Sequence, residues 1–285
     1  MKILITGSAG LIGTALTQVL QDAGYSLRTF DRDGTKGADG VEHETGDLRD
    51  FAVVKHVMEG MDAVVHSGAI ANDRKGEDDK VLDVNVMGTL NVLVAATQTT
   101  VQRVVSFSSI NALGAVGRHK KAVQLPITDD YPRHPMSPYQ LSKHLGEEAC
   151  RMYTERYGLT TISLRPGYVA KSDVYEGWRN NTNPQEGAKH QANELWAYVD
   201  LRDVCEAVKL SLTLEGVKND AFLLFADDTT LTIPTQELID QYYPETPWIA
   251  DKNAYFADNP FRSPMDTSHA REVLKWTPKH SWRAE

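Results

Sequence analysis

Short apolar runs alternate along this chain with longer stretches whose apolar residues recur at helical spacing. The runs predict buried strands at 3–5, 26–30, 41–45, 62–66 and 103–107. The helical patterns fall between them, and the longest cover residues 81–97 and 138–157. This alternation is typical of an α/β protein with a doubly wound parallel sheet.

Three glycines follow the first apolar run and open the first helical pattern. Gly7 suits a tight turn, Gly10 lets the backbone approach a pyrophosphate, and Gly13 lets the helix pack close to the strand. The helix N-terminus then directs unpaired N–H groups at the phosphates. Strand, glycine loop and helix together predict a dinucleotide site in a Rossmann sheet.

Sheet-like runs return late in the sequence, at 197–199 and 221–226, after a polar insert. We therefore expect a Rossmann domain over residues 1–166 that is completed by residues 195–226. The remaining residues, 167–194 and 227–285, are expected to form a small discontinuous C-terminal substrate cap.

The composition excludes some classes of function but does not identify one. Lys and Arg number 30 against 39 Asp and Glu, a net charge of −9, so no basic surface indicates nucleic acid. No apolar run looks long enough to span a membrane, and no signal peptide precedes the first strand, so we expect a cytoplasmic protein. Cys150 and Cys205 are expected as buried free thiols. The histidines show no metal-ligand spacing, so no metal site is predicted.

The second strand ends at Asp31, eighteen residues past Gly13. A carboxylate there can accept both hydroxyls of the adenosine ribose and would repel a 2′-phosphate, which favours NAD. Arg32 follows directly and keeps NADP open, because a guanidinium can pair with that phosphate. A strand-end aspartate that merely caps a turn is the alternative interpretation.

Tyr139 and Lys143 lie one helical turn apart near the start of the helix predicted at 138–157. A tyrosine is a poor base at neutral pH, but a nearby ammonium favours its phenolate. The pair is therefore a candidate general acid/base with its activator. Tyr and Lys at this spacing also occur by chance, and the interpretation depends on their position after the fifth strand and its serine-rich end.

These motifs together resemble the extended short-chain dehydrogenases/reductases, and within them the NAD-dependent epimerase/dehydratase group. The resemblance covers nearly the whole chain. It is carried by motifs at 6–13, 85–89, 106–114, 137–143, 164–167 and 196–204. One departure is Leu113, where the group often has Tyr before the glycine that is here Gly114. We interpret it as altered substrate packing.

The resemblance implies a catalytic set of Ser109, Tyr139 and Lys143. Ser109 would hold the reacting substrate oxygen, Tyr139 would exchange its proton, and Lys143 would lower the tyrosine pKa and contact the nicotinamide ribose. The predicted NAD ligands are Gly7, Ala9, Gly10, Leu11, Ile12, Gly13, Asp31, Arg32, Asp47, Leu48, Ser67, Gly68, Ala69, Asn85, Tyr139, Lys143 and Pro166. The predicted substrate contacts are Ala71, Ser109, Ile110, Asn111, Gly167 and Arg179.

The cap is short for an enzyme that grips a whole nucleotide sugar. We therefore expect an NAD-dependent dehydrogenase of a small carbohydrate: an aldose, a uronate or a sugar phosphate. Lys171, Arg179 and the cluster at 118–121 offer charges for an anionic group. A UDP-hexose 4-epimerase with retained NAD is the alternative, and a non-catalytic NAD-binding regulator is a third. The resemblance also implies a homodimer, paired through the helices at 81–97 and 138–157.

Overall fold

The computed structural model describes residues 1–34, 38–117 and 121–284. Their helices and strands divide between two compact units, each assembled from separate stretches of chain. The first unit comprises Met1–Ser108, Ser137–Leu164 and Ala207–Ala221. The second comprises Ser109–Met136, Arg165–Glu206 and Phe222–Glu285.

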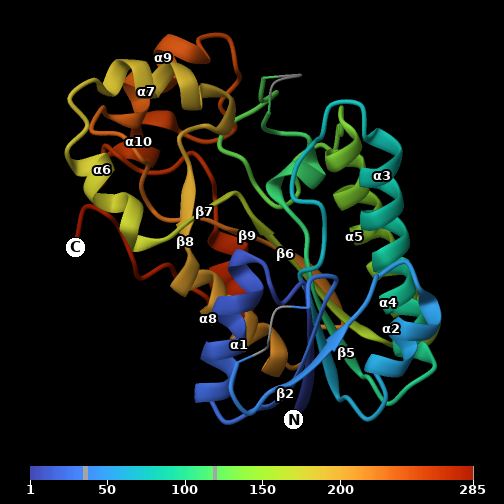
Figure 1. Cartoon of the computed structure of the whole chain (residues 1–285). Helices are drawn as coiled ribbons and strands as arrows, with labels where there is room; N and C mark the ends of the chain where they lie inside the picture. The colour runs from blue at the N-terminus through green and yellow to red at the C-terminus, as the bar shows by residue number, and fades with distance from the viewer. Residues whose placement is uncertain (35–37, 118–120, 285) are drawn as a thin grey trace. The chain divides into compact units, whose positions relative to one another are not determined.

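The main sheet has the strand order of a doubly wound fold (Figure 1). Its strands are β1 Lys2–Thr6, β2 Ser26–Asp31, β3 Glu42–Thr45, β4 Ala63–His66, β5 Arg103–Phe107, β6 Thr160–Pro166 and β9 Asn219–Leu224. Among the described residues these seven pair in the order β3-β2-β1-β4-β5-β6-β9. The pairs from β3 through β6 are parallel. The predicted α/β fold with a parallel Rossmann sheet is confirmed.

Helices cover the sheet of the first unit on both faces, with α2, α4 and α5 on one side and α1 on the other (Figure 1). They are α1 Leu11–Asp22, α2 Phe51–Val57, α3 Asp78–Leu82, the π-helix η1 Asp83–Met87, α4 Gly88–Thr97 and α5 Pro138–Tyr157; α8 Leu201–Thr213 enters this unit at Ala207. Leu4, Val64 and Val104 from three neighbouring strands share one apolar core with residues of α2, α4 and α5. Such nearly continuous apolar strands are expected where both sheet faces are covered.

The helical run Asp78–Thr97, which joins α3, η1 and α4, corrects one sequence expectation. An 18-residue window within it has a mean hydropathy of 1.2, enough by length and composition to cross a membrane. The same test is passed by core helices of soluble proteins. Here 44% of the window is buried, and Val92, Leu93 and Ala95 pack in the core of the first unit.

The second unit combines short helices with a separate small sheet. Its elements are η2 Ile110–Leu113, β7 Tyr168–Ala170, η3 Ser172–Val174, α6 Tyr175–Arg179, α7 Pro184–Gln191, η4 Ala192–Glu194, β8 Tyr198–Asp200, α9 Thr235–Tyr242, α10 Lys252–Phe256 and η5 Ala270–Leu274. β7 and β8 pair in parallel as a two-stranded sheet. The predicted addition of residues 197–199 to the main sheet is therefore wrong, whereas the late strand near 221–226 is found there as β9. The division into a nucleotide domain and a substrate cap stays a prediction.

The segment predicted as a long loop, residues 114–137, contains no helix or strand of its own among its described residues. It is nevertheless anchored by apolar side chains. Leu125, Ile127 and Tyr131 are buried in the core of the second unit. Backbone bonds tie it down as well: the N–H of Leu125 donates to Pro247 and that of Ile127 to Pro264.

Both cysteines are buried and free, as predicted. Cys150 lies on α5 and Cys205 on α8. Burial raises the pKa of the Cys150 thiol to about 12, with the nearby Glu147 charge adding to the shift. This thiol is therefore neutral and packs as a small apolar side chain.

Close approach of β1, β4 and α1 leaves no room for side chains at the glycine loop. Gly7 adopts a φ of +71°, and a Cβ there would lie 2.5 Å from the Gly68 nitrogen. A Cβ on Gly13 would lie 2.2 Å from the Gly7 carbonyl oxygen. The glycines at these two positions are required by sterics, as the sequence predicts for a tight turn and close helix packing.

We predict that Gly13→Ala destabilises the protein although alanine is the better helix former. Overpacking of this kind costs about 1–3 kcal/mol, which outweighs the gain in helix propensity of up to ~1 kcal/mol. Gly146→Ala on α5 is the matched control, because its Cβ would meet only Thr89 Cγ2 at 3.8 Å, an ordinary contact. Chemical denaturation of both variants measures the difference. A Gly13→Ala protein as stable as Gly146→Ala would contradict the steric argument.

Candidate active site

A pocket of about 290 Å³ opens in the first unit around the carboxyl ends of β1, β2, β3 and β4. Its lining includes the glycine loop and the ends of all four strands: Gly7, Ala9, Gly10, Phe30, Asp31, Arg32, Asp33, Gly46, Asp47, Leu48, Ser67, Gly68, Ala69, Ile70, Arg74 and Val84. The strand order reverses between β1 and β4, and such a switch point is where open α/β sheets bind ligands.

The loop at the start of α1 suits the pyrophosphate of a dinucleotide. Gly7, Ala9 and Gly10 line the pocket, and at Gly7 and Gly13 a Cβ would overlap neighbouring backbone. This side of the pocket is therefore bordered by backbone with no side chain larger than the Ala9 methyl group, and a phosphate can come close to the helix N-terminus there. Leu11 and Ile12 form the first turn of α1 and do not line the pocket; the Leu11 side chain is 49% exposed. Their role as NAD ligands stays a prediction.

Asp31 is oriented by the backbone on both sides of its carboxylate. Oδ2 accepts a hydrogen bond from the Ala9 N–H at 3.0 Å, and Oδ1 accepts one from the Asp33 N–H at 3.1 Å. The carboxylate thus lies against the glycine loop and within the pocket lining. Arg32 also lines the pocket, but its side chain is largely exposed, and its Nε lies 4.0 Å from Asp33 Oδ1.

Leu48 is inserted between two glycines and fixes the loop after β3. A Cβ on Gly68 would lie 2.6 Å from Leu48 Cδ1, and one on Gly88 would lie 3.1 Å from Leu48 Cβ. The Asn91 amide donates to the Leu48 carbonyl at 2.9 Å. Next to it, the Arg49 guanidinium bonds Asp47 and holds the pKa of that carboxyl below its usual range. Asp47 and Leu48, both predicted as NAD ligands, therefore lie in the pocket wall.

Asn85 lies in the π-helix η1 and clamps the loop after β4 to α5. Its amide oxygen accepts from the Ile70 N–H at 2.7 Å, and its amide nitrogen donates to the Ile70 carbonyl at 3.0 Å. The same nitrogen donates to Ser142 Oγ at 3.1 Å. Isolated π-turns inside helices often occur at functional sites. The observed role of Asn85 is to position this loop, and direct contact with NAD stays a prediction.

Tyr139 and Lys143 share one face of α5, as their spacing predicts. Lys143 Nζ donates to the Phe107 carbonyl at 2.7 Å and lies 5.8 Å from the centroid of the Tyr139 ring. Ser137 caps the helix, its hydroxyl accepting from the Gln140 N–H, and the Tyr139 N–H donates to Asp73 Oδ1 at 2.8 Å. The ammonium is thereby fixed at the end of β5 and close to the tyrosine ring.

Burial sets the charge state of the groups around this pair. It lowers the pKa of Lys143 to about 8, an effect that the Glu147 carboxylate opposes. It also lowers the pKa of the buried His66 to about 3, with the Lys143 charge adding to the shift. His66 is therefore a neutral imidazole, bonded to Thr6 through Nδ1 at 2.8 Å and to Thr89 through Nε2 at 3.1 Å.

Ser109 belongs to the second unit and starts the short helix η2. Its hydroxyl accepts from the Asn111 N–H at 3.2 Å and donates to the Pro166 carbonyl at 3.4 Å. Three predicted residues, Ser109, Asn111 and Pro166, are thus brought together. Gly167 follows Pro166, and a Cβ there would lie 2.5 Å from the Phe225 ring. The shared catalytic role of Ser109 with Tyr139 and Lys143 stays a prediction.

Burial limits how two residues of the second unit, Ile110 and Leu113, can affect a substrate. The Ile110 side chain is 1% exposed and packs in the apolar core, so only its backbone is available to a ligand. Leu113, at the position where the family pattern often has Tyr, is fully buried in that same core. Ala71 belongs to the first unit and lies exposed in the loop after β4.

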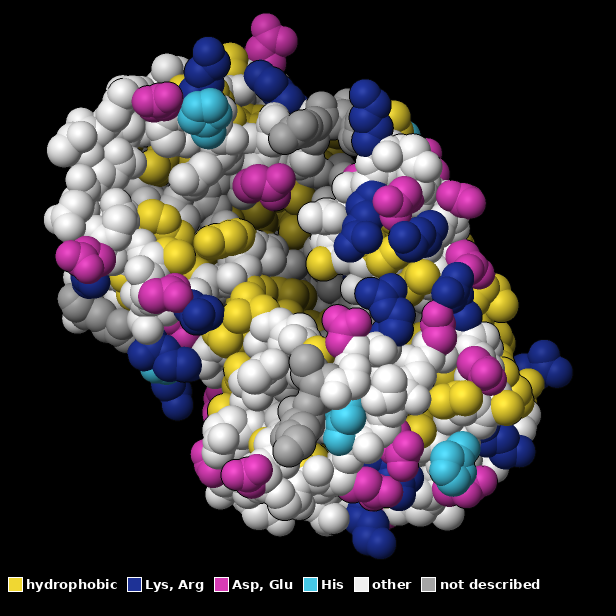
Figure 2. Space-filling model, viewed as in Figure 1, with side chains coloured by type: hydrophobic (Ala, Val, Ile, Leu, Met, Phe, Trp, Pro, Cys, Tyr) yellow, Lys and Arg dark blue, Asp and Glu magenta, His cyan; other side chains and the backbone are white. Residues whose placement is uncertain are grey.

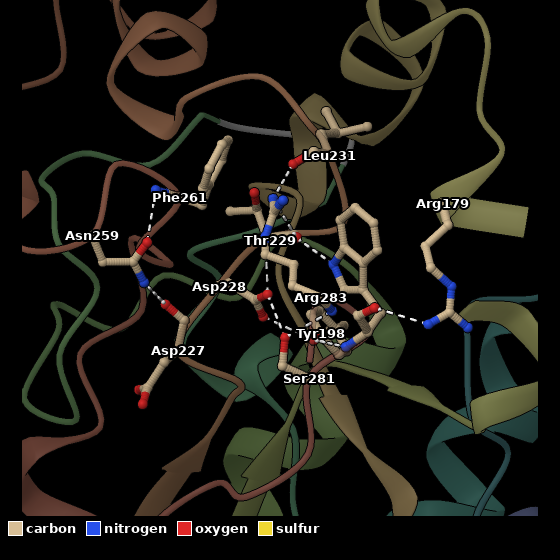
Figure 3. A network of polar contacts seen from close by, with 11 residues as sticks. Arg179, Tyr198, Asp227, Asp228, Thr229, Leu231, Asn259, Phe261, Ser281 and Arg283 are labelled. Atoms are coloured by element: carbon tan, nitrogen blue, oxygen red, sulfur yellow. Dashed lines mark hydrogen bonds and ion pairs between the residues drawn. The ribbon is translucent and has the colours of Figure 1, made fainter. Parts of the chain in front are cut away.

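Arg179 ends α6 and is tied to the carboxy-terminal segment of the second unit (Figure 3). Its Nη1 donates to the Trp282 carbonyl at 3.2 Å. The buried Asp228 lies in the same network, accepting from Tyr198 at 2.8 Å and from Ser281 at 2.7 Å. Arg283 also pairs with Asp228, at 3.1 Å.

Lys171 and Lys121, which were also expected to bind an anionic group, interact with other groups of the protein. Lys171 pairs with Asp173 at 3.0 Å, and Lys121 Nζ donates to the Tyr242 carbonyl at 2.7 Å. Residues 118–120 of that cluster lie outside the described residues.

Sequence reasoning found most of the pocket but missed several of its members. Phe30 lines it from the end of β2, a placement that the strand pattern could have signalled. Outside the pocket lining, Glu147 and His66 were also missed as groups that interact with Lys143. Glu147 follows Lys143 by four residues, so the two are neighbours on one helix face. This spacing alone did not identify Glu147, because many exposed glutamates have the same spacing from a lysine.

The fold and its glycine-lined pocket define a Rossmann protein built to hold a dinucleotide. The sequence profile of the NAD dependent epimerase/dehydratase family matches residues 3–224. The chain belongs to this family. Its cofactor is NAD, as the sequence predicts.

Individual relatives are similar over part of their length. A uronate dehydrogenase of Pseudomonas putida is 34% identical over 168 residues, which cover 58% of this chain and 60% of that protein. A putative UDP-glucose 4-epimerase of Methanocaldococcus jannaschii is 30% identical over 170 residues, 57% of this chain and 54% of that protein. The chain thus matches well under two thirds of either relative.

A solved structure resembles the whole fold. It is a short-chain dehydrogenase/reductase superfamily protein of Agrobacterium tumefaciens with bound NAD. The TM-score is 0.75 at 23% identity, and the match covers 99% of this chain and 94% of that one. At this identity the likeness shows the fold alone.

Proposed function

We propose that this protein is an NAD-dependent dehydrogenase of a small carbohydrate, either an aldose, a uronate or a sugar phosphate. The observation that carries the proposal is the arrangement on α5, where Lys143 is fixed by the Phe107 carbonyl with its ammonium 5.8 Å from the Tyr139 ring. An ammonium in that position stabilises a phenolate, and a phenolate can remove a proton from a hydroxyl.

In this mechanism the chain binds the substrate hydroxyl and moves its proton. Tyr139 accepts the proton at its phenolate oxygen, while Ser109 holds the same substrate oxygen by a hydrogen bond. Lys143 keeps the phenolate form accessible near neutral pH. Bound NAD supplies the hydride acceptor at the nicotinamide ring.

The residues that line the first unit's pocket are proposed to hold the NAD. The loop of Gly7, Ala9 and Gly10 would lie against the pyrophosphate at the N-terminus of α1, and Asp31 would accept hydrogen bonds from the ribose hydroxyls. Ser67, Gly68 and Ala69 would let the cofactor approach the end of β4. The support is their common position on one pocket and the glycine contacts that exclude side chains from it.

The dehydrogenase proposal is supported by the similarity to the uronate dehydrogenase, and a uronate is the first substrate to test. A UDP-hexose 4-epimerase is the second candidate, favoured by the similarity to the putative UDP-glucose 4-epimerase. A non-catalytic NAD-binding regulator is the third, and the oriented Tyr139 and Lys143 argue against it.

A substrate screen separates these functions. We predict that NADH forms with at least one uronate, aldose or sugar phosphate, and that UDP-hexoses yield neither NADH nor a C4 epimer. Tyr139→Phe should reduce the rate by ~10²–10⁴-fold, because it removes the proton acceptor and keeps the ring. Tyr157→Phe, an exposed tyrosine on the same helix, is the matched control and should leave the rate unchanged. Epimerisation of UDP-hexose without net NADH would favour the second candidate instead.

Cofactor choice tests the role of Asp31. We predict that wild type prefers NAD over NADP by ~10–100-fold, the value of a charge-assisted hydrogen bond of about 1.5–3 kcal/mol. Asp31→Ser should remove that preference, because the carboxylate no longer contacts the ribose or repels a 2′-phosphate. Asp33→Ser is the control, since it removes a neighbouring exposed charge and should keep most of the preference. Equal use of both cofactors by wild type would refute the assignment of Asp31 to the ribose.

We also propose a homodimer formed through η1 and α5. Met87, Leu141, Leu145 and Met152 expose between 38% and 45% of their surface there. Hydrophobic side chains appear among the charged ones over this group of helices in Figure 2. Burial of such residues between two copies would stabilise the pair.

Sedimentation velocity measures this state. We expect a dimer at micromolar concentration, and Leu145→Glu should dissociate it because a charge would enter the apolar contact. Glu148→Gln on the same helix is the control and should leave the dimer intact. A monomeric wild type would end the proposal.

A further inference from the structure

A buried carboxylate lies one helical turn beyond Lys143. Glu147 is 6% exposed, and its Oε1 accepts a hydrogen bond from Ser108 Oγ at 2.6 Å. Positions 143 and 147 are neighbours on one helix face. A charged side chain in such a place is costly unless it is both bonded and compensated by an opposite charge.

The end of β5 holds both members of this pair through two consecutive residues. The Phe107 carbonyl accepts from Lys143 Nζ at 2.7 Å, and the next residue, Ser108, donates to Glu147. A strand end thus fixes an ammonium and a carboxylate on successive turns of α5. All of these groups lie in the first unit.

The other groups around Lys143 do not replace this carboxylate. On β4, His66 is neutral because its pKa is lowered to about 3. On α5, Cys150 is neutral because its pKa is raised to about 12, and Tyr139 presents its ring. Asp73, in the loop after β4, accepts from the Tyr139 backbone. Glu147 is the carboxylate whose charge opposes the effect of burial on the lysine.

We propose that Glu147 is a positioning residue of the active site: anchored by Ser108, its carboxylate keeps the Lys143 ammonium charged and directed at the end of β5. The inference rests on the proposed roles of Tyr139 and Lys143 in the reaction. Glu147 itself contacts neither substrate nor cofactor in this account and acts through the lysine.

Glu147→Gln tests the proposal because glutamine keeps the size and the acceptor for Ser108 but removes the charge. The primary readout is the ionisation of Lys143 in the purified full chain. It is obtained from the pH dependence of its acetylation by acetic anhydride and followed by mass spectrometry of its peptide. We expect a midpoint near 8 in wild type. It should fall by about one pH unit or more in the variant, because the opposite charge on the next helical turn is lost.

Three further variants test whether the effect comes from the charge at position 147 and its anchor. Glu148→Gln removes a carboxylate from the next residue, which is partly exposed and pairs with Arg151 at 3.1 Å, and it should leave the midpoint unchanged. Glu147→Asp keeps the charge and should restore much of the wild-type value. Ser108→Ala removes the anchor of the carboxylate and should lower the midpoint by a smaller amount. It also tests the proposal if Glu147→Gln does not fold.

The activity readout uses the sugar that gives NADH in the screen. The alkaline limb of kcat/KM should move down by about one pH unit in Glu147→Gln, so that activity at pH 8 falls about fivefold while KM for NAD changes little. An unchanged Lys143 midpoint in both Glu147→Gln and Ser108→Ala would overturn the proposal. Failure of the proposed function would appear differently, as a screen without NADH and without an effect of Tyr139→Phe, and it would leave the acetylation result standing.

Discussion

The absence of space for a Cβ between β1, β4 and α1 is the constraint on which the candidate site depends. A Cβ on Gly7 or Gly13 would overlap neighbouring backbone, whereas a Cβ on Gly68 would meet the end of the Leu48 side chain. Because the three elements are pressed together there, the helix N-terminus, the end of β2 with Asp31 and the loop carrying Leu48 all border one pocket. The shape of this pocket wall is therefore set by positions that carry no side chain.

Local patterns made much of the first unit predictable. A buried strand, a glycine loop and an amphipathic helix depend on residues near one another in sequence, and so the strands β1, β2, β4 and β5 and the pocket at their ends could be foreseen. The spacing of Tyr139 and Lys143 likewise indicated a shared helix face. Ten of the residues predicted to bind NAD line the same pocket.

Pairings between distant residues were beyond the sequence. β8 has the apolar character of a sheet strand, but its partner is β7, thirty residues earlier, and not the main sheet. Ile110 follows the catalytic-serine position, yet its side chain packs with residues more than a hundred positions away. Asn85 fits a cofactor motif, but its side-chain amide forms hydrogen bonds with Ile70 and Ser142. In each case tertiary contacts decide the role, and a single sequence does not contain them.

The interleaving of the two units has a consequence for the order in which the chain can fold as it is made. The first unit takes its last stretch from Ala207–Ala221, after most of the second unit has been synthesised. The second unit in turn needs Ser281 and Arg283, which bond the buried Asp228. Neither unit can be completed by the amino-terminal half of a nascent chain. Each unit therefore depends on residues that are synthesised late, the first on Ala207–Ala221 and the second on Phe222–Glu285.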